Sequence, residues 1–159
     1  MNITILCVGK IKEACFRDAV GEYAKRMRRY ARLSIVEVAD EKTPDNASEA
    51  DNARILRIEG ERLLARIRPG DYVCALAIQG QTRSSEAFAD YIEKMRVLSK
   101  GNLVFVIGGS LGLAPEVMAR ANDSISFSPM TFPHQLMRVI LLEQIYRAHK
   151  IIHKEPYHK

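Results

Sequence analysis

The sequence contains no apolar run of the roughly 18 residues that a membrane-spanning helix needs. Its first residues, MNITILCVGKIKE, have no basic leader before a short apolar run, so they predict a β-strand and no signal peptide. Internal repeats, low-complexity segments and linker-like stretches are also missing. These absences predict a cytoplasmic protein without membrane contact, in which residues 1–159 form a single domain with a workable core.

Cysteine is scarce, and its spacing gives no sign of a disulfide or a zinc site. The three cysteines are odd in number and none belongs to a CxxC pair. Cys7 and Cys74 lie within apolar runs, which predicts that they are buried and reduced. His149 and His153 are four residues apart, but no convincing third metal ligand stands beside them. The sequence therefore predicts no metal site, and it assigns these two histidines to a basic surface.

Charge is unevenly distributed along the chain. The net charge is +5, from 24 Lys+Arg against 19 Asp+Glu. Residues 25–32 hold basic residues and no acid, residues 147–159 are again basic, and residues 37–51 are acidic. Two basic segments favour a polyanionic partner such as nucleic acid. Basic residues also collect in the last turns of helices because of the helix dipole, so a solvated helix end remains the alternative.

Apolar runs with strand character alternate with segments of helical periodicity over the whole chain. Strands are predicted at 3–8, 33–38, 72–78, 103–107 and 124–127. Helices are predicted between them, with apolar stripes at 16–30, 56–67 and 88–95, a short helix from Pro115 to near Asn122, and a last helix beginning at Pro133. Ser48 and Asp51 have the spacing of a capping box, and Gly60 indicates close helix packing. This order predicts an α/β fold with a mostly parallel sheet and helices on both faces.

Ligands of open parallel sheets bind beyond the carboxyl ends of the strands, which makes three strand exits candidates for a site. These exits are Leu76–Gly80, Gly108–Gly112 and Phe127–Phe132. The second reads GGSLG, and its glycines indicate that the backbone comes close to another group. It is not GxGxxG, it follows a late strand, and no acid lies about 20 residues further on, so a dinucleotide site is disfavoured.

The stretch Phe127–Arg147 combines an irregular loop with an unusually apolar helix. Pro133 suits the first turn of a helix, because no backbone donor is needed there. His134 and Arg138 are four residues apart and therefore share one face near the helix N-terminus. Residues 139–142 are all apolar, which predicts a helix that is buried on most sides. The two polar side chains suggest the floor of a site, and a buried helix with a solvated end is the alternative.

Several of these motifs together resemble one family. They are ITILCVGKIK at the N-terminus, LAIQG at 76–80, FVIGGSLG at 105–112, SFSPMTFPHQLMRVILLEQIYRA at 126–148 and PYHK at the C-terminus. They are similar to the RlmH family of bacterial rRNA methyltransferases, within the SPOUT, or trefoil-knot, class. The similarity spans the whole chain, and the last three motifs together are highly specific. It implies a homodimer and a C-terminal trefoil knot, a feature that chain statistics alone would argue against.

The resemblance further implies a methyl donor, a substrate and a set of site residues. The donor is S-adenosylmethionine, and the substrate is N3 of pseudouridine 1915 in 23S rRNA within assembled ribosomes. The residues implied to contact the donor are Leu76, Gly108, Phe127, Ser128, Pro129, Met130, Thr131 and Phe132.

The resemblance also makes His134, Arg138, Tyr157 and His158 the candidate catalytic residues. Arg138 is expected to stabilise an anion or a phosphate, and the Tyr157–His158 tail to form a lid that contacts the base. No metal is called for. Two interpretations compete with a methyltransferase: a non-catalytic basic RNA-binding α/β module, and a nucleotide-dependent oxidoreductase.

Overall fold

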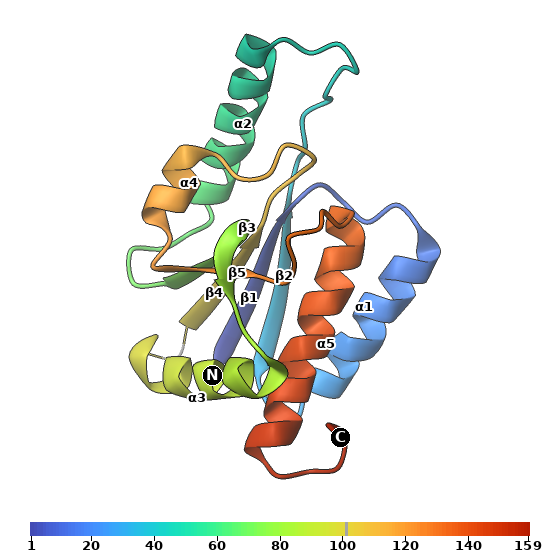
Figure 1. The fold of residues 1–159 in the computed structure, drawn as a ribbon, viewed down its shortest axis with the longest axis vertical. Coiled ribbons are helices and arrows are strands. Elements are labelled where there is room, and N and C mark those ends of the chain that lie inside the picture. Colours follow the sequence, from blue (N-terminus) through green and yellow to red (C-terminus); the bar gives the residue numbers. More distant parts are fainter. Residues whose placement is uncertain (101) are drawn as a thin grey trace.

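In the computed structural model, residues 1–100 and 102–159 are described, and within them five strands form one sheet in the order β2-β1-β4-β3-β5 (Figure 1). The strands are β1 (Asn2–Val8), β2 (Arg32–Val38), β3 (Tyr72–Thr82), β4 (Asn102–Ile107) and β5 (Asp123–Ser126). The helices are α1 (Ala14–Met27), α2 (Glu49–Leu64), α3 (Ser85–Leu98), α4 (Pro115–Arg120) and α5 (His134–Ile152). Each neighbouring pair of these strands is parallel, so the predicted α/β fold is confirmed.

Helices cover both faces of the sheet, as the apolar strands predicted. Helices α1, α3 and α5 lie on one face, and α2 and α4 lie on the other (Figure 1). Alternate residues of β1 serve the two layers, because successive side chains of a strand point to opposite faces. Ile3 and Ile5 belong to the first core cluster, whereas Leu6 and Val8 belong to the second. All four are at most 1% exposed, which explains the continuous apolar run.

Two local predictions about α2 are confirmed. The Ser48 hydroxyl accepts a hydrogen bond from the backbone N–H of Asp51 at 3.1 Å, and the Asp51 carboxylate accepts one from the Ser48 backbone N–H at 3.1 Å. This capping box satisfies two backbone donors at the start of the helix. Near the other end, a Cβ added to Gly60 would lie 2.8 Å from the Cβ of Ala114. Glycine therefore allows α2 to approach the segment that leads into α4.

Strand β3 is longer than the sequence predicted. It was expected to end at Ile78, but it continues to Thr82 with an irregularity between Leu76 and Gln81, both of which are in register with Ile125. A Cβ on Gly80 would lie 2.7 Å from the backbone nitrogen of Ile125. The glycine thus lets the chain return against β5 after the irregularity. The polar run Gln79–Gly80–Gln81 gave no strand signal, because the pairing of Gln81 with Ile125 of β5 is not visible in the local sequence.

Helix α5 lies between α1 and α3 and begins directly after Pro133, as predicted (Figure 1). None of its residues is fully exposed, and Leu141, Leu142 and Ile145 are completely buried. The predicted buried helix is therefore confirmed. The trefoil knot is consistent with this architecture and stays a prediction. Among the helices of the described residues, none is long and apolar enough to cross a membrane.

The cysteines behave as predicted, but one histidine does not. Cys7 and Cys74 are buried free thiols, and burial raises the pKa of each to about 12. His149 was assigned to a basic surface, yet it is buried and stacks on the ring of Tyr30 with centroids 5.4 Å apart. Burial, followed by the neighbouring His153, lowers the pKa of His149 to about 4. His149 is therefore a neutral core residue at physiological pH.

Candidate active site

A pocket of about 400 Å³ opens at the carboxyl ends of β4 and β5 and beside the irregularity of β3 that follows Leu76. Its walls come from all three strand exits that the sequence singled out, and from the first turns of α5. This volume lies within the range of small-molecule sites, which favour such positions in parallel sheets. Of the eight predicted donor-binding residues, seven line the pocket: Leu76, Gly108, Phe127, Ser128, Met130, Thr131 and Phe132. Pro129 belongs to the same loop but is not part of the lining.

The glycine-rich loop is closed by its own backbone. The N–H of Gly112 donates to the carbonyl of Gly109 at 3.1 Å, and Gly112 has a φ of +84°. A Cβ on Gly108 would collide with the carbonyl oxygen of Gly112. The glycines of this exit predicted that the backbone comes close to another group, and a ligand was the group expected. The structure gives a different reason: the tight loop itself leaves no room for a side chain at position 108.

The loop between β5 and α5 is shaped by two serine hydroxyls. The hydroxyl of Ser126 donates to the carbonyl of Ser128 at 3.1 Å, and the hydroxyl of Ser128 accepts from the N–H of Met130 at 3.0 Å. Such local bonds fix an irregular backbone without a regular ladder. Met130 is 73% exposed, and Ile78 beside the pocket is 50% exposed. The pocket therefore has an apolar rim.

His134 lines the pocket from the first turn of α5. It is half-buried, and burial followed by the nearby charge of Arg138 lowers its pKa below the ordinary histidine value. Both effects disfavour the imidazolium, so the ring is neutral at physiological pH and can accept a proton. Met137, one turn further on, also lines the pocket and was not predicted. The three-residue spacing from His134 was the signal that could have found it.

Arg138 does not line the pocket, although it shares a helix face with His134. Its side chain is 1% exposed, and its guanidinium donates to Glu37 Oε1 at 2.7 Å and to the carbonyls of Val8 and Gly9 at 2.9 and 2.6 Å. The expectation that it stabilises a substrate anion or phosphate is at odds with this geometry. A guanidinium committed to these acceptors and shielded from solvent has no open face for a substrate.

The contacts of Arg138 hold the start of the β1–α1 loop. The carboxylate of Glu37 also accepts from the N–H of Ile11 at 3.3 Å, and Gln135 accepts from the N–H of Lys12 at 3.0 Å. Arg17 then donates to the carbonyl of Lys12 at 2.9 Å. Residues 9–13 are thus attached to the first turns of α5. The loop carries the exposed Lys10 and Lys12, and the charge of Lys12 is one of those that act on the pKa of His134.

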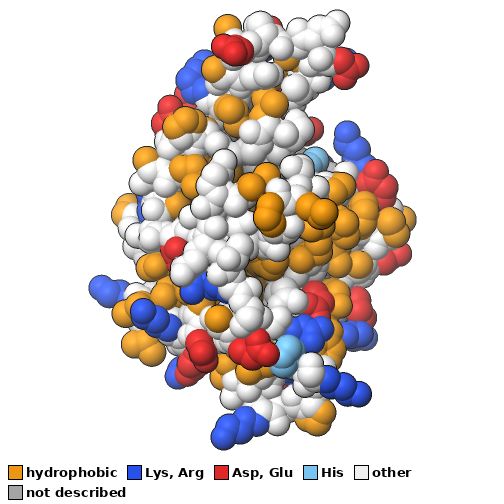
Figure 2. Space-filling view, in the orientation of Figure 1, with side chains coloured by type: hydrophobic (Ala, Val, Ile, Leu, Met, Phe, Trp, Pro, Cys, Tyr) orange, Lys and Arg blue, Asp and Glu red, His pale blue; other side chains and the backbone are white. Residues whose placement is uncertain are grey.

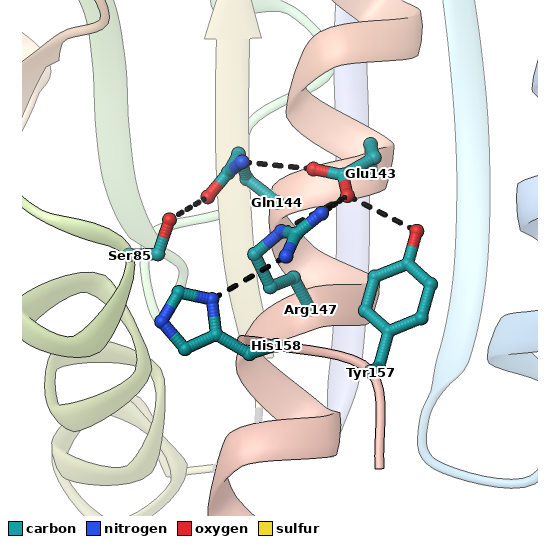
Figure 3. A network of polar contacts seen from close by, with 6 residues as sticks. All are labelled: Ser85, Glu143, Gln144, Arg147, Tyr157 and His158. Carbon is teal, nitrogen blue, oxygen red and sulfur yellow. Dashed lines mark hydrogen bonds and ion pairs between the residues drawn. The ribbon is translucent and has the colours of Figure 1, made fainter.

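The C-terminal tail folds back onto α5 and is not part of the pocket (Figure 3). Tyr157 donates from its hydroxyl to Glu143 at 3.1 Å, and the Arg147 guanidinium lies 4.7 Å from the centre of the Tyr157 ring. His158 contacts Glu86 of α3 at 2.8 Å and Arg147 at 3.3 Å.

The tail therefore contacts the second half of α5, whereas His134 lies at the start of that helix. Glu143 lies nine positions after His134 in the helix, which corresponds to about 14 Å along the axis. The expected Tyr157–His158 lid does not cover the pocket of its own chain. Burial, with hydrogen bonding to Tyr23 and Glu143, also raises the pKa of Tyr157 to about 12, so its phenol is a donor at neutral pH.

Among residues 1–100 and 102–159, no group of three His, Cys, Asp or Glu side chains gathers where it could hold a metal ion. The pocket instead offers backbone groups of glycine-rich and serine-rich loops, an apolar rim and a neutral imidazole. These features suit an organic ligand with both polar and apolar parts.

Comparison with known proteins agrees with this geometry. A family model described as "Predicted SPOUT methyltransferase" matches residues 1–158, and the chain belongs to this family. Within it, the chain is 58% identical over 159 residues to ribosomal RNA large subunit methyltransferase H of Clostridium novyi (strain NT), with full coverage of both chains. The protein of the same name from Exiguobacterium sibiricum is 54% identical, again over the full length of both. The family predicted from the sequence motifs is confirmed.

Solved structures support the fold. The Legionella pneumophila protein Lpg2936, which was solved with its cofactor SAM bound, aligns with a TM-score of 0.51 at 9% identity. The alignment covers 93% of this chain and 66% of that one. At such low identity the likeness concerns the arrangement of the elements alone.

Proposed function

We propose that this protein transfers a methyl group from S-adenosylmethionine to N3 of pseudouridine 1915 in 23S rRNA of the assembled ribosome, as a single-domain enzyme of the cytoplasm. One observation carries the proposal: three strand exits converge on a pocket in a chain whose full-length relatives are named large-subunit rRNA methyltransferases. The basic segments of the chain fit an RNA substrate.

The donor fits the pocket described above. S-adenosylmethionine supplies an activated methyl group on a sulfonium, so the protein mainly has to align the reactants and exclude water. The glycine-rich loop and the Phe127–Phe132 loop offer backbone donors and acceptors for its polar groups. Leu76 and Phe127 offer apolar contacts for its flat base. We assign donor binding to these loops, with Pro129 acting through the shape of its loop.

Methylation of N3 requires that the N3–H proton leaves when the N–C bond forms. His134 is the pocket residue best suited to accept this proton, because its imidazole is kept neutral by burial and by Arg138. In this assignment, N3 attacks the methyl carbon, the C–S bond breaks, the donor becomes S-adenosylhomocysteine and the proton passes to His134. Arg138 serves this chemistry indirectly, by positioning residues 9–13 and by lowering the pKa of His134.

The RNA backbone is proposed to lie along the β1–α1 loop. Lys10 and Lys12 are exposed there, and their loop is fixed to the first turn of α5 through Gln135. Lysine ammonium groups at fixed positions can bind phosphates, in contacts that weaken as salt rises. This placement brings the phosphates near the mouth of the pocket, while Arg138 behind the loop remains buried.

The enzyme is proposed to act as a homodimer. Hydrophobic side chains gather on the face that lies over the first half of α5 and the adjoining part of α1 (Figure 2). Leu136, Met137, Val139 and Ile140 of α5 stay partly exposed, and Met130 at the pocket rim is 73% exposed. Such a patch next to a binding pocket favours association with a second copy. The tail of one copy does not reach its own pocket. In the dimer, the Tyr157–His158 tail of one copy could instead reach the pocket of the other.

The decisive experiment measures transfer of labelled methyl from S-adenosylmethionine to ribosomes and, separately, to free 23S rRNA. We expect incorporation at one pseudouridine of ribosomes and much less in free RNA. Calorimetry with S-adenosylmethionine, S-adenosylhomocysteine and NAD distinguishes the alternatives. Binding of neither S-adenosyl compound would support a non-catalytic RNA-binding module, and binding of NAD would support an oxidoreductase.

A further inference from the structure

Glu59 is a buried carboxyl group directly behind the glycine-rich loop. It lies on the second half of α2 and is 4% exposed. Its Oε1 accepts a hydrogen bond from the backbone N–H of Glu41 at 3.0 Å. Its Oε2 is buried and has no hydrogen-bond partner within the described part of the chain. An orphaned buried oxygen is costly and rare, so its position calls for an explanation.

The carboxyl occupies the space that a side chain at position 109 would need. A Cβ added to Gly109 would lie 3.1 Å from Glu59 Oε2 and 3.4 Å from Oε1. The missing side chain of Gly109 and the carboxyl of Glu59 are therefore complementary in shape. Gly109 lines the donor pocket on its other side, so the carboxyl supports the wall of the pocket from behind.

The same carboxyl joins two loops. Through Glu41 it holds residues 39–47, the loop between β2 and α2. That loop reaches the glycine-rich loop a second time, where the hydroxyls of Thr43 and Ser110 are 3.3 Å apart. A shift of Glu59 would therefore move both the 39–47 loop and the Gly109–Ser110 backbone.

Burial and neighbouring charges shift the pKa of Glu59. Its pKa is raised, first by burial and then by the acidic Asp40 and Glu41, against the effect of the Glu41 N–H and of Arg62. Arg62 is itself bound to the carboxylate of Glu41 and to the carbonyl of Ala39. Oε1 is satisfied by the Glu41 N–H, while Oε2 faces Gly109 without a hydrogen-bond partner among the described residues.

We propose that Glu59 is a positioning residue for the methyl donor, because its carboxyl group fills the space between the 39–47 loop and the glycine-rich loop. The inference rests on the proposed function, because it takes the glycine-rich loop to be a donor-binding wall. Glu59 touches neither reactant. Glu59 affects donor affinity by setting the position of the Gly109–Ser110 backbone relative to the sheet.

The test compares Glu59→Ala and Glu59→Gln with the control Glu61→Gln. Glu61 is two residues away on the exposed side of α2, where it pairs with Arg57 at 2.8 Å. Glutamine keeps an oxygen for the Glu41 N–H and places a neutral donor where Oε2 lies. The readouts are the Kd for S-adenosylhomocysteine by calorimetry, kcat and KM on ribosomes, and the active fraction by titration.

We expect Glu59→Ala to raise the donor Kd and KM about tenfold, which corresponds to about 1.4 kcal/mol or one buried hydrogen bond. At saturating donor, kcat should stay within about twofold of the wild type, and Glu59→Gln should restore donor affinity to within about threefold. A purely structural role would instead lower the active fraction and leave the donor KM unchanged. That result, or a glutamine variant as weak as the alanine variant, would overturn the proposal.

A second variant, Gly109→Ala, keeps the test valid if Glu59→Ala misfolds. The comparison also separates the proposed function from the proposed role of Glu59. Gly109→Ala should weaken donor binding in the wild-type background, because its Cβ meets Glu59 and also Val8 Cγ1 at 3.1 Å. In the Glu59→Ala background its additional effect should be smaller, since one of the two obstacles is gone. Strictly additive effects would count against direct support of Gly109 by Glu59. If the wild-type protein binds no S-adenosylhomocysteine at all, the proposed function fails; if it binds and Glu59→Ala binds equally well, only this inference fails.

Discussion

Replacing Arg138 by methionine tests whether this residue acts on the substrate or on the fold. Methionine keeps most of the apolar stem and removes the guanidinium. The change deprives three acceptors of their donor: Glu37 Oε1 and the carbonyls of Val8 and Gly9. We expect a stable but weakened fold, near-normal donor binding and a marked loss of methyl transfer.

The size of the stability loss follows from the burial of these partners. Removing one member of a buried ion pair costs about 3–5 kcal/mol when the remaining charge has no access to water. Glu37 is 30% exposed, so its carboxylate can regain water when Arg138 is removed. The cost of losing this ion pair is therefore below that range. The carbonyls lose charge-assisted bonds worth about 1.5–3 kcal/mol each in other proteins, in part recovered by relaxation. A net loss of about 3 kcal/mol is expected.

That loss can be measured by unfolding and compared with activity. For a chain of 159 residues, an unfolding entropy of about 2.1 cal/mol/K per residue converts 3 kcal/mol into a drop in Tm of about 9 °C. Glu37→Gln should cost less, and the double variant should cost less than the sum, because the two residues share one interaction. Calorimetry with S-adenosylhomocysteine should show a Kd within about threefold of the wild type, since Arg138 lies outside the pocket.

The opposite pattern would refute this reasoning. If Arg138→Met left Tm within about 1 °C of the wild type and yet abolished methyl transfer, the guanidinium would act directly on substrate, as sequence reasoning expected. Arg138→Lys adds a second check, because an ammonium keeps the charge but cannot bridge all three acceptors. A lysine variant with normal Tm and normal activity would also exclude the positioning role.

Four further outcomes are expected. The lowered pKa of His134 keeps its ring neutral to a lower pH, so on the acid side kcat should fall only below the ordinary histidine pKa of about 6.5. His134→Asn should remove this acid-side fall of kcat. An unchanged fall in the variant would exclude His134 as the base. Gly108→Ala should weaken donor binding in a folded protein, measured by calorimetry, because its Cβ would displace Gly112; normal affinity would contradict this. Light scattering at micromolar concentration should give the mass of a homodimer. Deletion of residues 156–159 should preserve donor binding but sharply reduce methyl transfer to ribosomes. A fully active truncated protein would remove Tyr157 and His158 from the site.

The pocket could be predicted from sequence because its position depends on strand order and little else. Apolar runs located β3, β4 and β5, and the carboxyl ends of parallel strands meet at one edge of a sheet. Each strand exit therefore contributed to the same pocket without any knowledge of side-chain contacts. The extension of β3 to Thr82 escaped prediction because it depends on the close approach of Gly80 to Ile125, 45 positions away in the sequence.

The roles of polar residues could not be predicted in the same way, because they depend on partners that are distant in sequence. Arg138 meets Glu37 across 101 positions, and Glu59 meets the Glu41 backbone across 18. A helical spacing of four residues correctly put His134 and Arg138 on one face, but it could not tell which one would face the pocket. The partners of Arg138 are Glu37 and the carbonyls of Val8 and Gly9, and they hold the guanidinium outside the pocket.

The role of the C-terminal tail also depends on distant partners, in this case on a second copy of the chain. The tail was expected to form a lid, yet within one chain Tyr157 and His158 are held by Glu143, Arg147 and Glu86 on α5 and α3. These contacts give the tail a defined direction at a distance from its own pocket. A fixed tail that cannot reach its own site can still complete the site of a second copy, provided that the apolar face over the first half of α5 is the interface. The tail and the dimer are therefore one hypothesis: a variant that is monomeric with its tail intact should lose methyl transfer while it still binds the donor.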